Sequence, residues 1–355
     1  MKYIFLSTGV FFLAGIPALF SIPTVPLPET SKEPIQEQQL SLQEQVGQML
    51  LIGFEGTALT PELAFLLHEV QPGGVLLLGR NIEDKQQLKE LISDLQNISP
   101  IPLFIAVDQE GGLVSRIFWG ESTASFELQD AEHAFQVGKK RAKELKETGI
   151  TMNLAPVLDS KTPGDFLFFR FFQKDEKTSL MLAQSLVRGH QEEGVVPVPK
   201  HFPGYDGISF NPEEGIIPLR AGIPDTSLFQ TLFQDVSLPV VMISHVAYRE
   251  LDFLPFPFSA KGVAFLKEKL GKDVLIMSDD LLSKSMRYRY SLSEIGKKAV
   301  SAGVDILLVA GYPQAETVMA FSKSLVHEAE KNEELRVRIE VAAAKILQFK
   351  EFSLP

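Results

Sequence analysis

The stretch that decides the fold is Lys272-Asp273-Val274-Leu275-Ile276-Met277-Ser278-Asp279-Asp280-Leu281, in which a short apolar run ends in two adjacent carboxylates. A run of this length is typical of a buried strand. In a parallel α/β fold the chain leaves the core at the carboxyl end of the strand, beside the substrate. An Asp at that point is therefore a candidate catalytic residue. The alternative is that the two carboxylates form a turn or cap the next helix, which suits one Asp better than two.

The same pattern recurs along the chain, because short apolar runs alternate with amphipathic segments. The runs cover residues 48–54, 74–78, 102–107, 152–157, 195–199, 239–244, 274–277 and 304–310. Between them, apolar residues such as Leu88, Leu91, Ile92 and Leu95 recur at the spacing of one buried helix face. Eight such units predict an α/β fold, a (β/α)8 TIM-like barrel, whose strands are buried on both sides. A doubly wound sheet is the alternative, and a last helix is expected over residues 333–351.

Polar residues follow six of the predicted strands. They are Arg80-Asn81, Asp108-Gln109-Glu110, Asp159, Lys200-His201, His245 and Asp279-Asp280. In a barrel these positions converge around one axis, whereas in an open sheet they would spread along an edge, so a shared ligand site favours the barrel. The chain has no H-x-H or H-E-x-x-H spacing and no nucleotide-binding glycine pattern. We therefore expect neither a metal site nor a cofactor.

Composition limits the class of protein and its partners. The 355 residues are 45% hydrophobic and 22% charged, which is typical of a globular chain with a large core, and we expect one domain over residues 40–355. With 34 basic and 45 acidic residues, the net charge of -11 argues against nucleic acid as a partner. The absence of cysteine excludes disulfides, thiolate catalysis and a lipobox-type lipid anchor.

The first residues carry information on the compartment. Residues 1–22 contain Lys2 followed by an apolar run that Gly15 and Pro17 interrupt, which is typical of a signal peptide for export. Because no clear small-x-small cleavage site is present, an uncleaved membrane anchor is the alternative. Residues 23–39 are rich in Pro, Glu, Gln and Ser and predict a solvated linker. We expect a periplasmic or extracellular protein, with membrane association if residues 1–22 remain.

Six ordered blocks of sequence then carry a resemblance. They are Pro72-Gly73-Gly74-Val75 with Gly79-Arg80-Asn81, Val107-Asp108-Gln109-Glu110-Gly111-Gly112, Asn153-Leu154-Ala155-Pro156-Val157-Leu158-Asp159, Lys200-His201-Phe202-Pro203-Gly204, Ser244-His245-Val246 and Ser278-Asp279-Asp280-Leu281. Over residues 40–350 the chain resembles glycoside hydrolase family 3, in particular the single-domain β-N-acetylglucosaminidases of bacterial peptidoglycan turnover. The resemblance implies a barrel and retaining hydrolysis of β-linked N-acetylglucosamine.

The resemblance also implies roles for particular residues. Asp279 corresponds to the nucleophile, and the sugar contacts carry over to Asp108, Arg116, Arg170, Lys200 and His201. A retaining glycosidase needs an ionised carboxylate beneath the anomeric carbon and an acid about 5 to 5.5 Å away, and Asp279 fits the first requirement. Asp280 is then expected to cap the next helix or to orient Asp279. For each sugar contact the alternative is an ion pair or hydrogen bond at the rim.

The loop after Lys200 departs from the family pattern. Family members continue with His-Gly and then an Asp-Ser-His whose His shuttles the proton. Here Tyr205 stands in place of the first His, Asn211 replaces the Asp and Glu213 replaces the shuttle His. Since Asn has no negative charge with which to make a neighbouring His basic, the dyad is absent as a unit. Leu113, where the family more often has Arg, and Tyr205 are departures near the ligand and suggest an altered substrate.

A glutamate can take over as general acid and base if its pKa rises from about 4.3 toward 6 to 7 in a closed pocket. Glu213 is the candidate, with Glu214 as the alternative, and Phe210, Pro212 and Ile216 are expected to form the apolar walls. The other interpretation is that both glutamates are solvated charges. Two functions follow, an exported glycosidase that uses Asp279 and Glu213, or a glycan-binding pseudoenzyme that has kept only the sugar socket. We predict the glycosidase.

Overall fold

The computed structural model describes residues 40–159, 162–311 and 314–354. The predicted signal peptide or anchor (1–22) and linker (23–39) lie outside the described residues. Among the helices of the described part, none combines the length and the apolar character needed to cross a bilayer.

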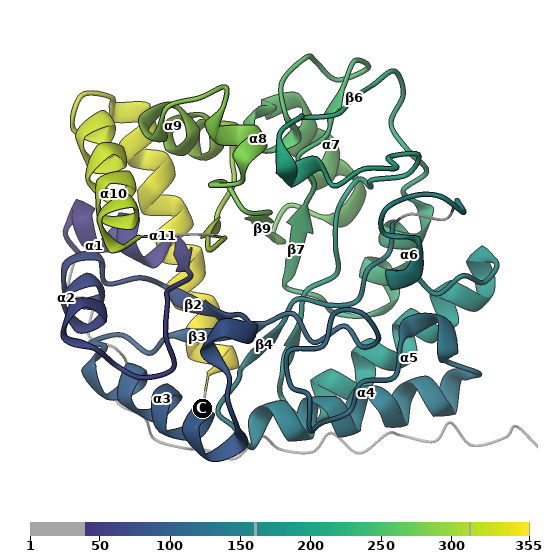
Figure 1. The fold of residues 1–355 in the computed structure, drawn as a ribbon. Coiled ribbons are helices and arrows are strands. Elements are labelled where there is room, and N and C mark those ends of the chain that lie inside the picture. Colours follow the sequence, from purple (N-terminus) through teal and green to yellow (C-terminus); the bar gives the residue numbers. More distant parts are fainter. Residues whose placement is uncertain (1–39, 160–161, 312–313, 355) are drawn as a thin grey trace, which may run out of the picture. The chain divides into compact units, whose positions relative to one another are not determined.

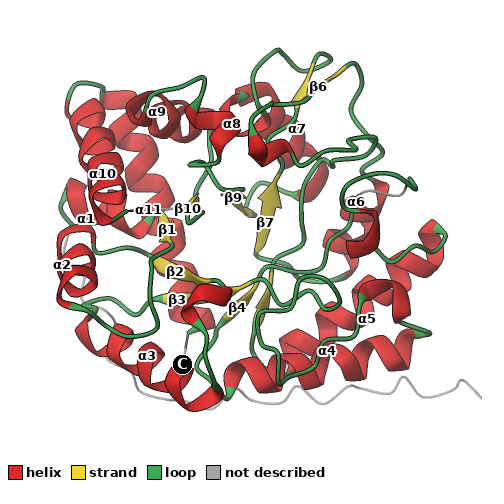
Figure 2. Ribbon diagram, in the orientation of Figure 1, coloured by secondary structure: helices red, strands yellow, loops and turns green. Residues whose placement is uncertain are grey.

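Eight parallel strands in the described part of the chain form a closed barrel (Figures 1 and 2). They are β1 (Leu50–Ile52), β2 (Gly74–Leu77), β3 (Phe104–Val107), β4 (Met152–Asn153), β5 (Val196–Pro197), β7 (Val240–Ile243), β9 (Leu275–Ser278) and β10 (Leu307–Val309). Hydrogen bonds order six of them as β10-β1-β2-β3-β4-β5 and pair β7 with β9. Parallel bridges from Phe202 to Ile243 and from Met277 to Ile306 join the two sets into a ring. Each strand lies within one of the eight predicted apolar runs, except that β9 extends one residue beyond its run, to Ser278. The alternative of an open doubly wound sheet is wrong.

Burial on both faces explains why these strands could be predicted from the sequence. All four residues of β2 and all four of β9 are buried. A strand of an antiparallel sheet with one wet face would alternate instead. The barrel strands therefore present continuous apolar runs, each of which ends where the chain reaches the rim.

Helices surround the barrel on the outside (Figure 1). Those that follow the strands are α2 (Pro61–Val70), α3 (Lys85–Ile98), α4 (Ala131–Lys146), α5 (Glu176–Glu192), α6 (Ser227–Asp235), α7 (Ala260–Leu270), α9 (Leu292–Ala302) and α10 (Ala315–Glu330). The expected face of α3, namely Leu88, Leu91, Ile92 and Leu95, is buried. The predicted last helix is α11 (Glu333–Ser353), and it packs against α1 (Leu42–Gln48).

Short elements in the loops after the strands position the site. The 3-10 helices η3 (Phe168–Arg170) and η4 (Pro212–Glu214) follow β4 and β5, and the short helix α8 (Lys284–Arg287) follows β9. A two-stranded parallel pair, β6 (Leu219–Arg220) with β8 (Ala247–Tyr248), was not predicted. It joins the loop after β5 to the loop after β7, and so it supports the segment that carries η4.

Candidate active site

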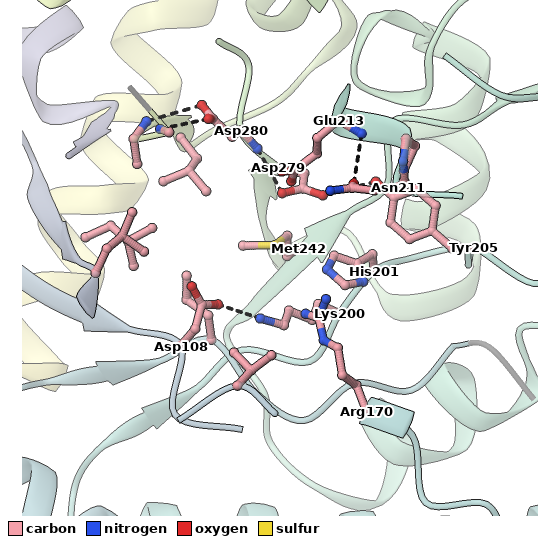
Figure 3. A pocket seen from close by; sticks show the side chains of 18 of the residues that line it. Asp108, Arg170, Lys200, His201, Tyr205, Asn211, Glu213, Met242, Asp279 and Asp280 are labelled. Atoms are coloured by element: carbon pink, nitrogen blue, oxygen red, sulfur yellow. Dashed lines mark hydrogen bonds and ion pairs between the residues drawn. The ribbon is translucent and has the colours of Figure 1, made fainter. Parts of the chain in front are cut away.

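A cavity of about 340 Å³ opens at the carboxyl ends of the strands. This volume is at the lower end of the range for small-ligand pockets. All of the predicted site residues line it, namely Asp108, Arg116, Arg170, Lys200, His201, Glu213 and Asp279. Figure 3 shows Asp279, Asp280 and Glu213 on one side of the cavity and Asp108, Arg170 and Lys200 on the opposite side. The structure therefore brings together residues that are up to 171 positions apart, from Asp108 to Asp279.

Asp279 follows β9 and is almost completely buried, with 8% of its surface exposed. Its Oδ1 accepts a hydrogen bond from the backbone N–H of Asp280 (2.9 Å), and its Oδ2 accepts one from the hydroxyl of Tyr205 (3.0 Å). Burial alone would raise the pKa of Asp279, but the interactions with the nearby imidazoles of His245 and His201 and these two hydrogen bonds lower it. The carboxylate is thus ionised at neutral pH, as a nucleophile must be.

Asp280 has a different task. Its carboxylate accepts hydrogen bonds from the backbone N–H groups of Leu282 (3.1 Å), Ala310 (3.2 Å) and Gly311 (2.8 Å). These bonds tie the turn after β9 to the loop after β10. Because its backbone N–H also bonds to Asp279, Asp280 orients its neighbour, which is one of the two roles expected for it.

On the opposite wall, two cations share one buried carboxylate. Glu110 accepts from Nε (2.7 Å) and Nη2 (2.6 Å) of Arg170, and Nζ of Lys200 lies 2.6 Å from Glu110 Oε1 and 2.6 Å from Asp108 Oδ1. Burial would raise the pKa of Glu110, but the charges of Arg170 and Lys200 lower it to about 2. Asp108 and Glu110 likewise raise the pKa of Lys200 against the effect of burial. The cluster fixes both cations at the cavity wall without consuming all of their donors.

Two further polar side chains are held by the loops that follow β3 and β5. Oδ1 of Asp159 accepts from the backbone N–H of His201 (3.0 Å), and its Oδ2 accepts from that of Tyr205 (2.9 Å). The backbone N–H of Arg116 donates to Oε1 of Gln109 (2.7 Å). Arg116 lines the cavity, and its Nε is buried without a hydrogen-bond partner among the described residues.

Glu213 lies on η4, where its backbone N–H donates to Oδ1 of Asn211 (3.1 Å). The residue that replaced the family's Asp therefore caps the short helix that presents Glu213. Burial raises the pKa of Glu213 well above its ordinary value, and the negative charges of Asp279, Asp280 and Asp108 raise it further. A carboxyl in this environment is protonated at a pH where an exposed one is not.

The expected apolar walls around Glu213 are only partly present. Pro212 is buried, but Phe210 is 44% and Ile216 62% exposed, so that part of the prediction is wrong. Burial is nevertheless the largest cause of the raised pKa of Glu213, and the nearby carboxylates add to it. Glu214 instead forms an ion pair with Lys284 (2.8 Å) and its side chain is 63% exposed, which favours Glu213 over Glu214 as the acid.

Residues 41–349 match the family described as Glycosyl hydrolase family 3 N terminal domain. The chain belongs to glycoside hydrolase family 3. A beta-hexosaminidase of Bordetella parapertussis is 29% identical over 309 residues, which are 81% of this chain and 86% of the relative. A beta-hexosaminidase of Nitrosomonas eutropha is 33% identical over 288 residues, 75% of this chain and 81% of the relative.

Solved structures of family 3 proteins agree with these sequence matches. A family 3 beta-N-acetylglucosaminidase from Paenibacillus sp. superposes with a TM-score of 0.80 at 27% identity, over 88% of this chain and 62% of that longer chain. A beta-N-acetylhexosaminidase from Beutenbergia cavernae superposes with a TM-score of 0.78 at 25% identity, over 88% of this chain and 99% of that chain. The predicted family and barrel are confirmed, and the protein is a glycosidase of the type that these family 3 relatives represent.

Sequence reasoning missed two residues of this family 3 site. The motif that contains Glu110 gives it no separate role, although its place two residues after Asp108, at the end of a strand, puts both on one side of the chain. Tyr205 stands out in the sequence only as a departure from the family. No signal in the sequence indicated its hydrogen bond to Asp279. In the described part of the chain, no cluster of three or more His, Asp or Glu side chains could hold a metal ion.

Proposed function

We propose that this family 3 glycosidase is an exported enzyme that removes β-linked N-acetylglucosamine from peptidoglycan-derived or related glycans by a retaining mechanism. The names of the relatives support the sugar, since they are beta-hexosaminidases and a beta-N-acetylglucosaminidase. The apolar run in residues 1–22 supports export.

One observation carries the catalytic part of the proposal. Asp279 and Glu213 line the same cavity, and their surroundings move their pKa values in opposite directions. When two carboxyl groups in one site are separated in this way, the one with the lowered pKa serves as the ionised group and the other as the acid. Asp279 is thus the nucleophile, and Glu213 replaces the missing Asp-His dyad.

The reaction then needs two steps. In the first, a carboxylate oxygen of Asp279 forms a bond to the anomeric carbon, the bond to the leaving oxygen breaks, and that oxygen takes the proton of Glu213. In the second, water gives a proton to the Glu213 carboxylate while its oxygen attacks the anomeric carbon. The electron pair of the broken ester bond returns to Asp279.

The opposite wall holds the sugar in place. Asp108 offers a carboxylate acceptor, and Arg116, Lys200 and His201 offer nitrogen donors along the same cavity. Arg170 donates hydrogen bonds from Nε and Nη2 to Glu110. It can therefore bind a ligand only through its remaining donors and its charge. The position of Lys200 between two carboxylates gives a fixed donor at little entropic cost when a ligand binds.

The test compares Glu213→Gln with Glu214→Gln, the adjacent residue at the surface, on aryl N-acetyl-β-glucosaminides. General acid catalysis contributes about 100- to 10,000-fold. Glu213→Gln should therefore lose activity in this range on a substrate with a poor leaving group. On a substrate with a good leaving group, the rate of the first step should fall far less. Azide should restore turnover of the good substrate by Glu213→Ala and give a β-glycosyl azide. Glu214→Gln should behave as the wild type.

Equal losses in the rate of the first step on both substrates, or no loss on either, would show that Glu213 is not the acid. If the wild type binds N-acetylglucosamine but cleaves none of the aryl glycosides, the protein is the pseudoenzyme that the sequence left open. Rates on the matching aryl glucoside decide the preference for an N-acetyl group. Cell fractionation of the full-length chain tests export, which a cytoplasmic location would contradict.

A further inference from the structure

Tyr205 is buried and tightly packed beside Asp279, the proposed nucleophile. It is 1% exposed, and its backbone N–H donates to Oδ2 of Asp159 (2.9 Å). Its ring contacts those of His201 and Phe166 edge-on, with centroids 5.1 Å and 5.8 Å away. These contacts hold the side chain in one position and fix its hydroxyl beside Asp279 (Figure 3).

The direction of the hydroxyl proton follows from its two contacts. The tyrosine oxygen accepts a hydrogen bond from the backbone N–H of His245 (3.0 Å) and lies 3.0 Å from Oδ2 of Asp279. A backbone N–H can only donate, and an ionised carboxylate can only accept. The single proton of the phenol is thus committed to Asp279.

We propose that Tyr205 is a positioning residue that keeps Asp279 ionised and makes it a better leaving group in the second step of the reaction. This inference rests on the proposed role of Asp279. A hydrogen bond to a charged acceptor is stronger than one to a neutral acceptor. Tyr205 therefore stabilises the free carboxylate more than the glycosyl ester.

The consequence differs between the two steps. When the ester bond to the anomeric carbon breaks, its electron pair returns to Asp279, and the hydrogen bond from Tyr205 strengthens as the charge forms. When Asp279 attacks, the same bond must weaken. Loss of the hydroxyl is thus expected to slow release of the sugar from the enzyme more than formation of the ester. Tyr205 and Glu213 lie in the same loop after β5, so the segment that lacks the Asp-His dyad provides both groups.

The experiment compares Tyr205→Phe with Tyr248→Phe. Tyr248 is a matched control, because it is 2% exposed and its hydroxyl donates to the carbonyl oxygen of Gly204, the residue next to Tyr205. Removing it loosens the same loop without touching Asp279. Both variants are assayed with an aryl N-acetyl-β-glucosaminide that has a good leaving group, beside Asp279→Asn.

For Tyr205→Phe we expect kcat to fall about tenfold or more, since a hydrogen bond to a charged group has about this effect. KM should fall as well, and a burst of aryl product should appear, because the glycosyl-enzyme accumulates. Removing a donor raises the pKa of Asp279, so the acidic limb of kcat/KM should move up by about one pH unit. Tyr248→Phe should change neither the limb nor the burst.

An unchanged acidic limb without a burst in Tyr205→Phe would overturn the inference, as would equal changes in both variants. Activity in Asp279→Asn would instead refute the proposed nucleophile. If Tyr205→Phe does not fold, wild-type protein containing 3-fluorotyrosine gives a second measurement. Its more acidic phenol is a stronger donor and should move the acidic limb down, and an upward movement or none would contradict the role of Tyr205.

Discussion

Replacing Glu110 by Gln tests the buried cluster that organises one wall of the cavity. The change keeps the shape of the side chain but removes the negative charge that Arg170 and Lys200 share. Lowering the pKa of Glu110 from 4.5 to about 2 corresponds to about 3 kcal/mol of native-state stability at neutral pH, at about 1.4 kcal/mol per pH unit. Breaking a buried ion pair by removing one partner costs a similar 3 to 5 kcal/mol.

The sign of the pH dependence follows from the lowered pKa. The contribution of the carboxylate is complete above about 4.5, the value for the unfolded chain, and is lost as the pH falls through about 2. The difference in the free energy of unfolding between wild type and Glu110→Gln should therefore shrink from about 3 kcal/mol at pH 7 to about 2 kcal/mol at pH 3.5. Urea unfolding at both pH values measures it.

Glu147→Gln is the control, because Lys85 and Glu147 are also 2.6 Å apart but solvent-exposed, and its effect on stability should be small. At pH 7 the activity of Glu110→Gln should also fall by about 100-fold, since Arg170 and Lys200 lose their fixed positions and misplacement by about 1 Å has that effect. Stability equal to the wild type, or a difference that does not change with pH, would refute the account of the cluster.

Two further predictions concern other parts of the barrel. Lys350 is buried with Nζ on Oε1 of Gln48 (2.8 Å), and burial lowers its pKa to about 7. The wild type therefore gains stability as the pH rises from about 7 to 10.5. At pH 7, Lys350→Met should be more stable than the wild type by about 2 kcal/mol, after allowing for the unpaired Gln48. Urea unfolding should show that this gain is lost near pH 10.5. A less stable variant at pH 7 would contradict the lowered pKa of Lys350. A Cβ on Gly311 would lie 2.2 Å from Oδ2 of Asp280, whereas one on Gly79 would have no atom within 4 Å. Gly311→Ala should thus displace Asp280 and lower kcat/KM by about tenfold or more, and Gly79→Ala should not; equal kcat/KM values for the two variants would separate Asp280 from catalysis.

The barrel could be predicted because its signal is local. Each strand is buried on both faces, so a run such as residues 274–277 is apolar throughout, and the polar residues that follow mark the rim. The pair β6 and β8 gave no such signal. Each of them has two residues that lie outside the eight apolar runs, and Leu219 in β6 is 46% exposed.

The site was only partly predictable, because its electrostatics depend on contacts that are distant in sequence. Glu110 and Arg170 are 60 positions apart and form their bidentate pair only in the fold. The position of Glu213 could be found by counting along the loop. The causes of its raised pKa could not, since they are its burial in the fold and the charges of Asp279, Asp280 and Asp108, which lie outside its loop.

The measurement that tests the central claim most directly is identification of the covalent intermediate. The wild type is incubated with a fluorinated N-acetylglucosaminyl fluoride, which slows release of the sugar, and is then analysed by intact mass and peptide mapping. We predict one added glycosyl group on Asp279, absent in Asp279→Asn, and a β-configured product from normal turnover. A label on another residue, or a product of inverted configuration, would contradict the retaining mechanism with Asp279 as nucleophile.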